Sequence, residues 1–245
     1  MENKRLTLFA GHYGSGKTNV ALNFAYRVRA MGFETVIADI DTVNPYFRTK
    51  DSEAELKEAG IELIASEFAG SNVDLPALPA AMYDIIFDSD KHAVIDIGGD
   101  DRGAFALGRY TPEILRENNY NMLMVINMYR PLTRTPEDTI EILHEIEAAS
   151  GIPFTGLVNN SNLGPFTDIG TLTDSFEYAR TVSEMTGLPI VATTCPDSDK
   201  FYQPKPGWGN APPSHEMPRS YPAAWSLRYK HQRNDIPALS SHPPR

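Results

Sequence analysis

The chain is poor in cysteine, in long apolar runs and in positive charge, and each shortage excludes a class of protein. The one cysteine, Cys195, has no partner for an internal disulfide, so a reducing cytoplasm is the natural compartment. No run reaches the roughly 18 apolar residues of a membrane span, and residues 1–5 do not resemble a secretion signal. With 32 acidic against 22 basic residues, the formal net charge is −10. We therefore expect a cytoplasmic protein that contacts neither nucleic acid nor an anionic membrane.

One glycine-rich segment carries a specific chemical signal. Residues 11–18 read Gly-His-Tyr-Gly-Ser-Gly-Lys-Thr, which fits the pattern G-x-x-x-x-G-K-[ST] of a phosphate-binding loop. In such a loop backbone N–H groups curl round a polyphosphate, Lys17 adds positive charge near the β and γ phosphates, and the Thr18 hydroxyl is a ligand for Mg²⁺. An apolar run precedes the loop and a helical pattern follows it, a setting in which the helix dipole favours an anion. The residues expected to bind a nucleotide are Gly11, His12, Tyr13, Gly14, Ser15, Gly16, Lys17, Thr18 and Asn19.

Apolar, β-rich runs alternate with helical patterns along residues 1–202. The expected strands are Leu6–Ala10, Thr35–Ile40, Ile61–Ile64, Ala93–Ile97, Met122–Asn127, Phe154–Val158 and Ile190–Thr194. The expected helices are Asn19–Met31, Ser52–Ala59, Leu75–Asp88, Pro136–Ser150 and Leu172–Thr186. Nearly continuous apolar strands are typical of a parallel sheet covered on both faces. The sequence therefore predicts an α/β, doubly wound fold: a mostly parallel seven-stranded sheet with helices on both faces and ligands at the carboxyl ends of the strands.

The composition changes near residue 203. Residues 203–245 hold 9 of the 19 prolines and 6 Lys or Arg against 2 Asp or Glu, so this segment carries +4 and residues 1–202 carry −14. We expect a P-loop nucleotide-binding domain over 1–202 and a Pro-rich basic tail over 203–245 that is largely irregular or disordered. A turn is expected at Ala223–Tyr229, and contact of the tail with a membrane or partner is the alternative to a loose tail.

An apolar strand that ends in a carboxylate supplies a second part of the expected site. The run that begins at His92 leads into Asp96 and then into Gly98-Gly99, the pattern called Walker B. We expect Asp96 to bind Mg²⁺ opposite the Thr18 hydroxyl. The two glycines would let the following loop approach the γ-phosphate and move when it leaves.

Other acidic residues are candidates for orienting the attacking water. Asp39 and Asp41 lie on the same side of an extended segment because side chains alternate there. Asp41, beyond the apolar run, is better placed to meet the phosphates, whereas Asp39 is either part of the site or structural. Asp100 or Asp101 either orients water or belongs to a solvated turn. The candidates for catalysis are therefore Lys17, Asp41 and Asp100.

Over roughly residues 5–200, the order of these features resembles the MinD/ParA/nitrogenase iron protein group of P-loop ATPases, members of the SIMIBI class. The glycine loop is similar to that group's deviant form, Lys-Gly-Gly-x-Gly-Lys-Thr. The Asp39-x-Asp41 segment resembles its switch I, in which the second Asp activates water, and residues 96–100 resemble the iron protein's switch II. Residues 156–161, Gly-Leu-Val-Asn-Asn-Ser, are similar to a segment in which an Asn contacts adenine, here Asn160. The resemblance implies Mg²⁺ with ATP, a protein partner and a nucleotide-dependent homodimer.

The chain departs from the family at two positions. His12 replaces a lysine that reaches the partner's phosphates across an ATP-sandwiched dimer. A histidine is shorter and partly charged near neutrality, so activation across a dimer loses its usual cation, and His12 either hydrogen-bonds a phosphate or packs. Gly103 stands at a cysteine position of the iron protein, and Cys195 lies elsewhere. We therefore expect no iron–sulfur cluster, and a Cys195 that packs as a small apolar residue.

The absence of one acid favours ATP over GTP. Most GTPases of this fold carry Asn-Lys-x-Asp after the sixth strand, whereas residues 159–162 read Asn-Asn-Ser-Asn and offer no acid to guanine. Arginines near the ends of strands four and five could stabilise phosphate charge, although each is equally typical of a surface ion pair. These arginines are Arg102, Arg109, Arg130 and Arg134.

We expect a Mg²⁺-dependent ATPase of the MinD/ParA type, in which hydrolysis switches partner binding or dimerisation. One alternative is a small-molecule kinase or ATP-dependent ligase of the same fold, similar to dethiobiotin synthetase, which would need an acceptor pocket near the switch loops. The other is a nucleotide-gated binding module with negligible turnover, which His12 in place of lysine favours.

Overall fold

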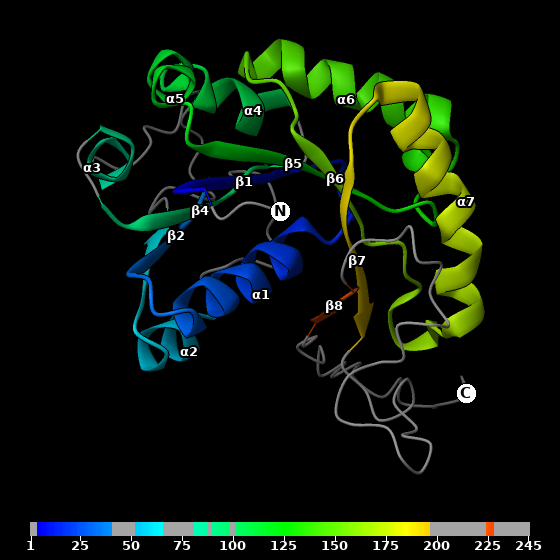
Figure 1. Ribbon diagram of the computed structural model, residues 1–245, viewed down its shortest axis with the longest axis horizontal. Helices are drawn as coiled ribbons and strands as arrows, with labels where there is room; N and C mark the ends of the chain where they lie inside the picture. The colour runs from blue at the N-terminus through cyan, green and yellow to red at the C-terminus, as the bar shows by residue number, and fades with distance from the viewer. Residues whose placement is uncertain are drawn as a thin grey trace, which may run out of the picture.

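The chain folds into one sheet between two layers of helices (Figure 1). The computed structural model describes residues 4–40, 52–65, 81–87, 90–98, 101–196 and 224–227. The strands are β1 (Leu6–Ala10), β2 (Thr35–Asp39), β3 (Ile61–Ala65), β4 (His92–Asp96), β5 (Tyr120–Ile126), β6 (Gly156–Asn159), β7 (Ile190–Pro196) and β8 (Ala224–Leu227). The helices are α1 (Lys17–Ala30), α2 (Glu53–Glu58), α3 (Ala81–Phe87), α4 (Asp101–Leu107), α5 (Thr111–Glu117), α6 (Pro136–Ser150) and α7 (Ile169–Thr186), with 3₁₀ turns η2 (Pro131–Thr133) and η3 (Gly164–Phe166).

The strands pair in parallel throughout, in the order β3-β2-β4-β1-β5-β6-β7-β8. This arrangement confirms the predicted α/β, doubly wound architecture. Because β1 lies between β4 and β5, the loops that follow these three strands meet at one edge of the sheet. In open parallel sheets this is the crevice in which ligands bind.

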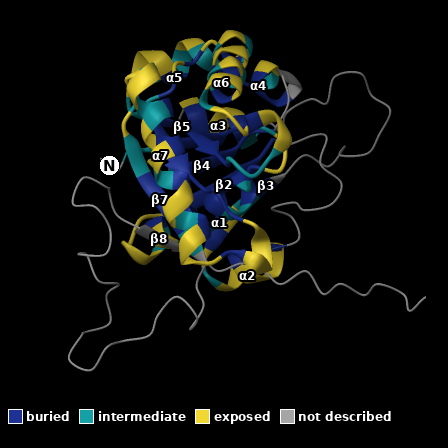
Figure 2. Cartoon of the chain, turned by 90° about the vertical axis from the view of Figure 1, so that its right-hand side faces the viewer, coloured by how far each residue is buried: buried dark blue, intermediate teal, exposed yellow. Residues whose placement is uncertain are grey.

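The two faces of the sheet are covered unequally. Alternation along β1 sends Leu6 and Leu8 into one apolar cluster and Phe9 into the other. The cluster of Leu6 and Leu8 packs against α3, α4, α5, α6 and α7, and the cluster of Phe9 packs against α1 and α2. Figure 2 shows the strands buried between helices whose outer faces are exposed. On the smaller face the ring of Phe24 in α1 meets that of Phe9 edge to face at 5.4 Å, which anchors α1 beside β1.

Two helices and one strand differ from the sequence prediction. The sequence predicts neither α4 nor α5, because helices of seven residues are too short to establish a helical period. It predicts a turn at 223–229, whereas the structure has β8 there, which pairs with β7 and makes an eighth strand. The segments 197–223 and 228–245 lie outside the described residues, so a largely irregular tail stays a prediction. Of the predicted helix Leu75–Asp88, the described part is α3.

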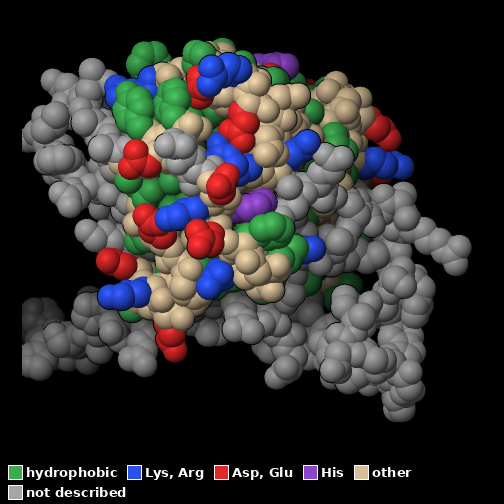
Figure 3. Space-filling model, turned by 60° about the vertical axis from the view of Figure 1, so that its left-hand side comes forward, with side chains coloured by type: hydrophobic (Ala, Val, Ile, Leu, Met, Phe, Trp, Pro, Cys, Tyr) green, Lys and Arg blue, Asp and Glu red, His purple; other side chains and the backbone are tan. Residues whose placement is uncertain are grey.

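The surface of the described part carries mixed charge. On the face that Figure 3 shows, acidic and basic side chains are interspersed, with hydrophobic side chains between them. A helix long and apolar enough to cross a membrane is not found among the described residues.

Candidate nucleotide-binding site

The glycine loop joins the end of β1 to the start of α1, as the motif predicts. Gly16 precedes α1 with a left-handed backbone (φ 85°), and a Cβ atom there would collide with the side-chain nitrogen of Asn160. Glycine is therefore required at this position. Lys17 and Thr18, in the first turn of α1, are 3% and 6% exposed. The first N–H groups of a helix have no partner within the helix, so this end of α1 presents donors to an anion.

Ser15, at the bend of the loop, is buried, and its hydroxyl oxygen has no hydrogen-bond partner within the described residues. A buried polar atom without a partner costs free energy, so such an atom commonly marks a place where a ligand binds. The Nδ1 atom of His12 donates to the backbone oxygen of Tyr13 at 3.0 Å. Tyr13 itself is exposed, and Asn19 lies half-buried in the first turns of α1.

Two carboxylates lie side by side at the ends of β2 and β4. Asp39 and Asp96 are partners in the register of these strands, and they are 6% and 0% exposed. Each lies two residues after a residue of the apolar cluster under α1, Ile37 and Val94 respectively, so both side chains point to the face that α1 covers. Asp39 therefore lies on the same face as Asp96, the face on which Lys17 and Thr18 begin α1.

Asn160, just after β6, supports the glycine loop by hydrogen bonding. Its side-chain nitrogen donates to the Ser15 backbone oxygen at 2.6 Å, and its side-chain oxygen accepts from the Thr194 hydroxyl in β7. Asn162 in turn donates to the Asn160 backbone oxygen at 2.7 Å. The resemblance implies that Asn160 contacts adenine, but its contacts among the described residues are with the protein. This support was not apparent from sequence, because Ser15 and Asn160 are 145 positions apart.

A second loop, between β5 and α6, is organised by Asn127, a residue that the sequence analysis missed. Asn127 is fully buried, and its side-chain oxygen accepts from the backbone N–H groups of Tyr129 (3.0 Å) and Asn162 (3.4 Å). This residue therefore joins the loops after β5 and β6. The available signal was a polar residue at the end of an otherwise apolar strand. Arg130 of the same loop contacts the glycine loop directly: its Nε donates to the Gly14 backbone oxygen at 2.7 Å.

Several predicted residues cannot be placed. Asp41 and Asp100, the candidates for orienting water, lie outside the described residues. Asp101 and Arg102 belong to the first turn of α4, where only the backbone is described. The roles predicted for these side chains stay predictions.

Gly103 in α4 lies against the backbone of Gly98, the first glycine after β4. A Cβ atom on Gly103 would lie 2.6 Å from the Gly98 nitrogen, closer than real Cβ atoms approach a backbone atom. A cysteine at position 103 would therefore force the two segments apart. This packing gives a physical reason, separate from the resemblance, for glycine at this position.

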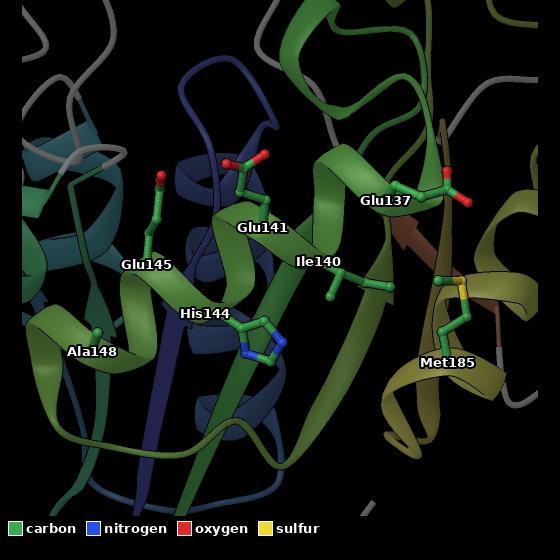
Figure 4. Close-up of a pocket in the computed structure, with 7 residues that line it drawn as sticks. All are labelled: Glu137, Ile140, Glu141, His144, Glu145, Ala148 and Met185. Atoms are coloured by element: carbon green, nitrogen blue, oxygen red, sulfur yellow. The ribbon is translucent and has the colours of Figure 1, made fainter.

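A hollow of about 690 Å³ lies away from the glycine loop, between α6 and α7. Figure 4 shows side chains along α6 and Met185 of α7 around it. Its lining residues are Glu137, Ile140, Glu141, His144, Glu145, Ala148 and Met185. None of the residues predicted for the nucleotide site lines this hollow.

Comparison with known proteins supports the fold. No family model and no curated protein matches the sequence. Among solved structures, the chain is similar to cell division protein FtsY from Thermotoga maritima (17% identity, 82% of this chain and 64% of that chain, TM-score 0.52). It is also similar to chloroplast FtsY from Physcomitrella patens (16% identity, 79% of this chain and 59% of that chain, TM-score 0.50). The chain thus spans about six-tenths of the length of these proteins.

At this level of identity the likeness establishes the fold alone. It supports the α/β fold with a parallel sheet and does not single out the MinD/ParA branch. The MinD/ParA assignment and the choice between ATP and GTP therefore belong to the proposal below.

Proposed function

We propose that this protein is a Mg²⁺-dependent ATPase of the MinD/ParA type, in which ATP hydrolysis switches binding to a protein partner or to a second copy of the chain. The observation that carries the proposal is the juxtaposition at the start of α1. Buried Lys17 and Thr18 open the helix on the face to which Asp39 and Asp96 point, beneath a glycine loop that Asn160 holds. A cation, free helix N–H groups and adjacent carboxylates are the parts that phosphoryl transfer requires.

The residues present fit a magnesium ion, since Mg²⁺ prefers one or two protein oxygens together with substrate phosphates. Thr18 and Asp96 would hold it, and when bound it would neutralise charge on the β- and γ-phosphates. Lys17 and the N–H groups of the loop would bind the phosphate oxygens. Asp41 or Asp100 would orient a water molecule towards the γ-phosphorus.

The reaction would be a simple hydrolysis. Water adds its oxygen to the γ-phosphorus, and the bond to the oxygen that bridges the β and γ phosphates breaks. That bridging oxygen stays on ADP, and the products are ADP, inorganic phosphate and a proton. Large apolar side chains exposed after β1, β5 and β6 and at the start of α7 would form the surface for a partner or second copy. They are Tyr13, Leu132, Leu163, Phe166 and Ile169.

ATP is proposed over GTP because of the loop after β6. Residues 159–167 contain no acid, and the side chains of Asn160 and Asn162 are hydrogen-bonded to the protein backbone. The first acid, Asp168, accepts from the Thr171 backbone N–H at 2.7 Å at the start of α7. These residues thus offer guanine no carboxylate to accept from its ring N1–H and its exocyclic amino group.

Isothermal titration of the full chain with Mg-ATP, Mg-GTP and Mg-ADP tests the proposal. We expect ATP to bind at least about tenfold more tightly than GTP, and Lys17→Ala to weaken ATP binding by about 100-fold through loss of a charged phosphate contact. Asp41→Asn should keep ATP binding and lose ATP-stimulated phosphate release. If folded wild-type protein gave no binding heat with either Mg-ATP or Mg-GTP, the proposed nucleotide site would be wrong.

The orientation of His12 favours one alternative, a nucleotide-gated binding module with negligible turnover. His12 Nδ1 donates to the backbone oxygen of Tyr13 in its own loop, and histidine is shorter than the lysine that it replaces, so its reach towards the phosphates of a second copy is reduced. ATP-dependent changes in oligomeric state, with phosphate release at background, would support this module over the ATPase. ADP release that rises above the basal rate only with an added metabolite would instead support a kinase or ligase.

A further inference from the structure

Arg130 lies over the middle of the glycine loop. Its Nε donates to the Gly14 backbone oxygen at 2.7 Å. Its Cδ and Nε lie 3.6 Å from where a Cβ atom on Gly14 would be, so the side chain rests against this glycine. Gly14 is the fourth of the eight residues of the phosphate-binding motif. The guanidinium group is therefore attached to the part of the loop that wraps a polyphosphate.

The loop that carries Arg130 is held in place by hydrogen bonds. The Asn127 backbone oxygen accepts from the Arg130 N–H at 3.2 Å and from the Thr133 hydroxyl at 2.8 Å. The Tyr129 hydroxyl donates to the Thr171 backbone oxygen at 2.9 Å, which ties the loop to α7. Because the backbone around Arg130 is held and its Nε bonds the Gly14 backbone oxygen, both backbone and side chain are partly positioned before a ligand binds.

Much of the donor capacity of Arg130 is unused. An arginine has five N–H donors and keeps its positive charge in proteins, and Gly14 accepts from one of them. Within the part of the chain that the structure describes, the two terminal nitrogens of Arg130 have neither a hydrogen bond nor a carboxylate partner. Such a planar pair of nitrogens matches the oxygens of a phosphate group.

We propose that Arg130 contacts the γ-phosphoryl group of the bound nucleotide and stabilises the charge that develops on the oxygen bridging the β and γ phosphates during hydrolysis. This inference rests on the proposed function and adds one residue to it. As the bond between the γ-phosphorus and the bridging oxygen breaks and water adds, negative charge shifts towards the bridging oxygen. Arg130 neutralises charge and takes up no proton, and the proton from water leaves with the products.

With Arg130 in this role, the activating cation comes from the same chain and not from a second subunit. In the family that the sequence resembles, a lysine reaches the phosphates from the other subunit, and His12 replaces it here. Arg130 comes from the same chain, because β5 is the immediate neighbour of β1. Turnover per molecule would then not depend on protein concentration. The sequence marked Arg130 as one of four candidates, and the contact with Gly14 singles it out.

The test compares Arg130→Ala and Arg130→Lys with Arg134→Ala, which removes the same charge from an exposed position of the same loop. We measure phosphate release, and affinities for Mg-ADP and for Mg-ADP with aluminium fluoride, a mimic of the transferred phosphoryl group. Arg130→Ala should lower kcat by about 100- to 1000-fold and weaken the fluoride complex similarly, while ADP affinity changes by less than about threefold. Arg130→Lys keeps the charge and should recover part of both losses, and Arg134→Ala should match wild type.

Other outcomes would overturn the proposal. Equal weakening of ADP and of the fluoride complex would make Arg130 a support for the loop alone. If the kcat of the wild-type protein rose with protein concentration, the cation that activates hydrolysis would come from a second copy of the chain. If wild-type protein binds ADP and the fluoride complex but Arg130→Ala does so equally well, the inference fails while the proposed function stands. If wild-type protein binds no nucleotide, the proposed function itself has failed. Binding of Mg-ADP with aluminium fluoride does not require turnover. Its affinity therefore tests the role of Arg130 even if hydrolysis is slow.

Discussion

The two ends of the same parallel strands differ in chemistry. At the carboxyl ends, buried polar side chains gather across neighbouring strands. Hydrogen bonds join Asn127, Asn160 and Thr194 through Asn162, and Asp39 lies beside Asp96. At the amino ends, ion pairs lie nearer the surface, such as Arg5 with Glu117 and Lys91 with Glu62. Burying a polar group costs free energy unless it is hydrogen-bonded, so the carboxyl ends hold groups that a fold designed for stability alone would avoid.

The comparison separates residues that shape the site from residues that only stabilise the fold. Buried polar groups at the carboxyl ends that contact the glycine loop should affect both nucleotide binding and stability. Contacts at the amino ends should affect stability alone. Substitutions at matched positions test this distinction.

The largest effect is expected for Asn160→Ala, which leaves the Ser15 backbone oxygen without its donor and leaves the Thr194 hydroxyl with only its 3.5 Å hydrogen bond to the Asn159 backbone oxygen. We expect a loss of about 2–4 kcal/mol in the free energy of unfolding, since a buried group left unpaired costs about 1–3 kcal/mol and the lost hydrogen bond to Thr194 adds about 1 kcal/mol. ATP affinity should fall at least about tenfold, because the glycine loop loses its support. Urea unfolding and isothermal titration measure the two quantities.

Asn159→Ala is the matched control. Asn159 is equally buried, but its side chain bonds the Ser175 hydroxyl (2.9 Å) and the Ser161 N–H (3.2 Å), away from the glycine loop. This variant should lose similar stability and keep ATP affinity within about threefold. Equal losses of affinity in both variants would show that general loosening, and not the contact with Ser15, controls nucleotide binding.

An intermediate effect, on stability alone, is expected at the amino ends for Arg5→Ala. Arg5 donates to the backbone oxygens of Ile85 (2.7 Å) and Ile86 (3.2 Å) and pairs with Glu117, so it joins α3 and α5 to β1. Its removal should lower the free energy of unfolding by about 1–2 kcal/mol and leave nucleotide affinity unchanged. Lys91→Ala, which breaks an exposed pair, should cost less than about 0.5 kcal/mol. A clear loss of ATP affinity in Arg5→Ala would contradict the expectation that contacts at the amino ends affect stability alone.

The smallest effect concerns pH and the start of α7. The Thr171 backbone N–H, followed by its hydroxyl, holds the pKa of Asp168 below its usual value of 3.8. Because the folded pKa is the lower one, the stabilisation is fully present above about pH 4 and is lost as the pH falls through the folded value. Asp168→Asn keeps a good N-terminal cap without the charge. The Tm difference between wild type and this variant should shrink as the pH falls from about 6 to about 2.5. A difference that stays constant would mean that the charge is unimportant.

The sequence predicted most of the fold because most of its signals are local. The seven predicted strands all form, and the bounds of β1 and α6 match the prediction residue for residue. At α6, Thr135 accepts from the Asp138 N–H, Pro136 begins the helix and Gly151 ends it in the left-handed region. The helices α4 and α5 were missed because seven residues do not reveal a period, and β8 because its pairing partner, β7, lies outside its own segment.

The glycine loop could be recognised from residues 11–18 alone because a phosphate-binding loop is built from consecutive residues, whose spacing sets the turn and the helix start. Its surroundings could not be recognised in this way. Asp39 meets Asp96 because β2 pairs with β4. Asn160 meets Ser15 and Arg130 meets Gly14 because β5 lies beside β1 and β6 follows β5 in the sheet. Strand order depends on how the whole chain buries its apolar surface, so these contacts between distant residues appear only once the sheet has assembled.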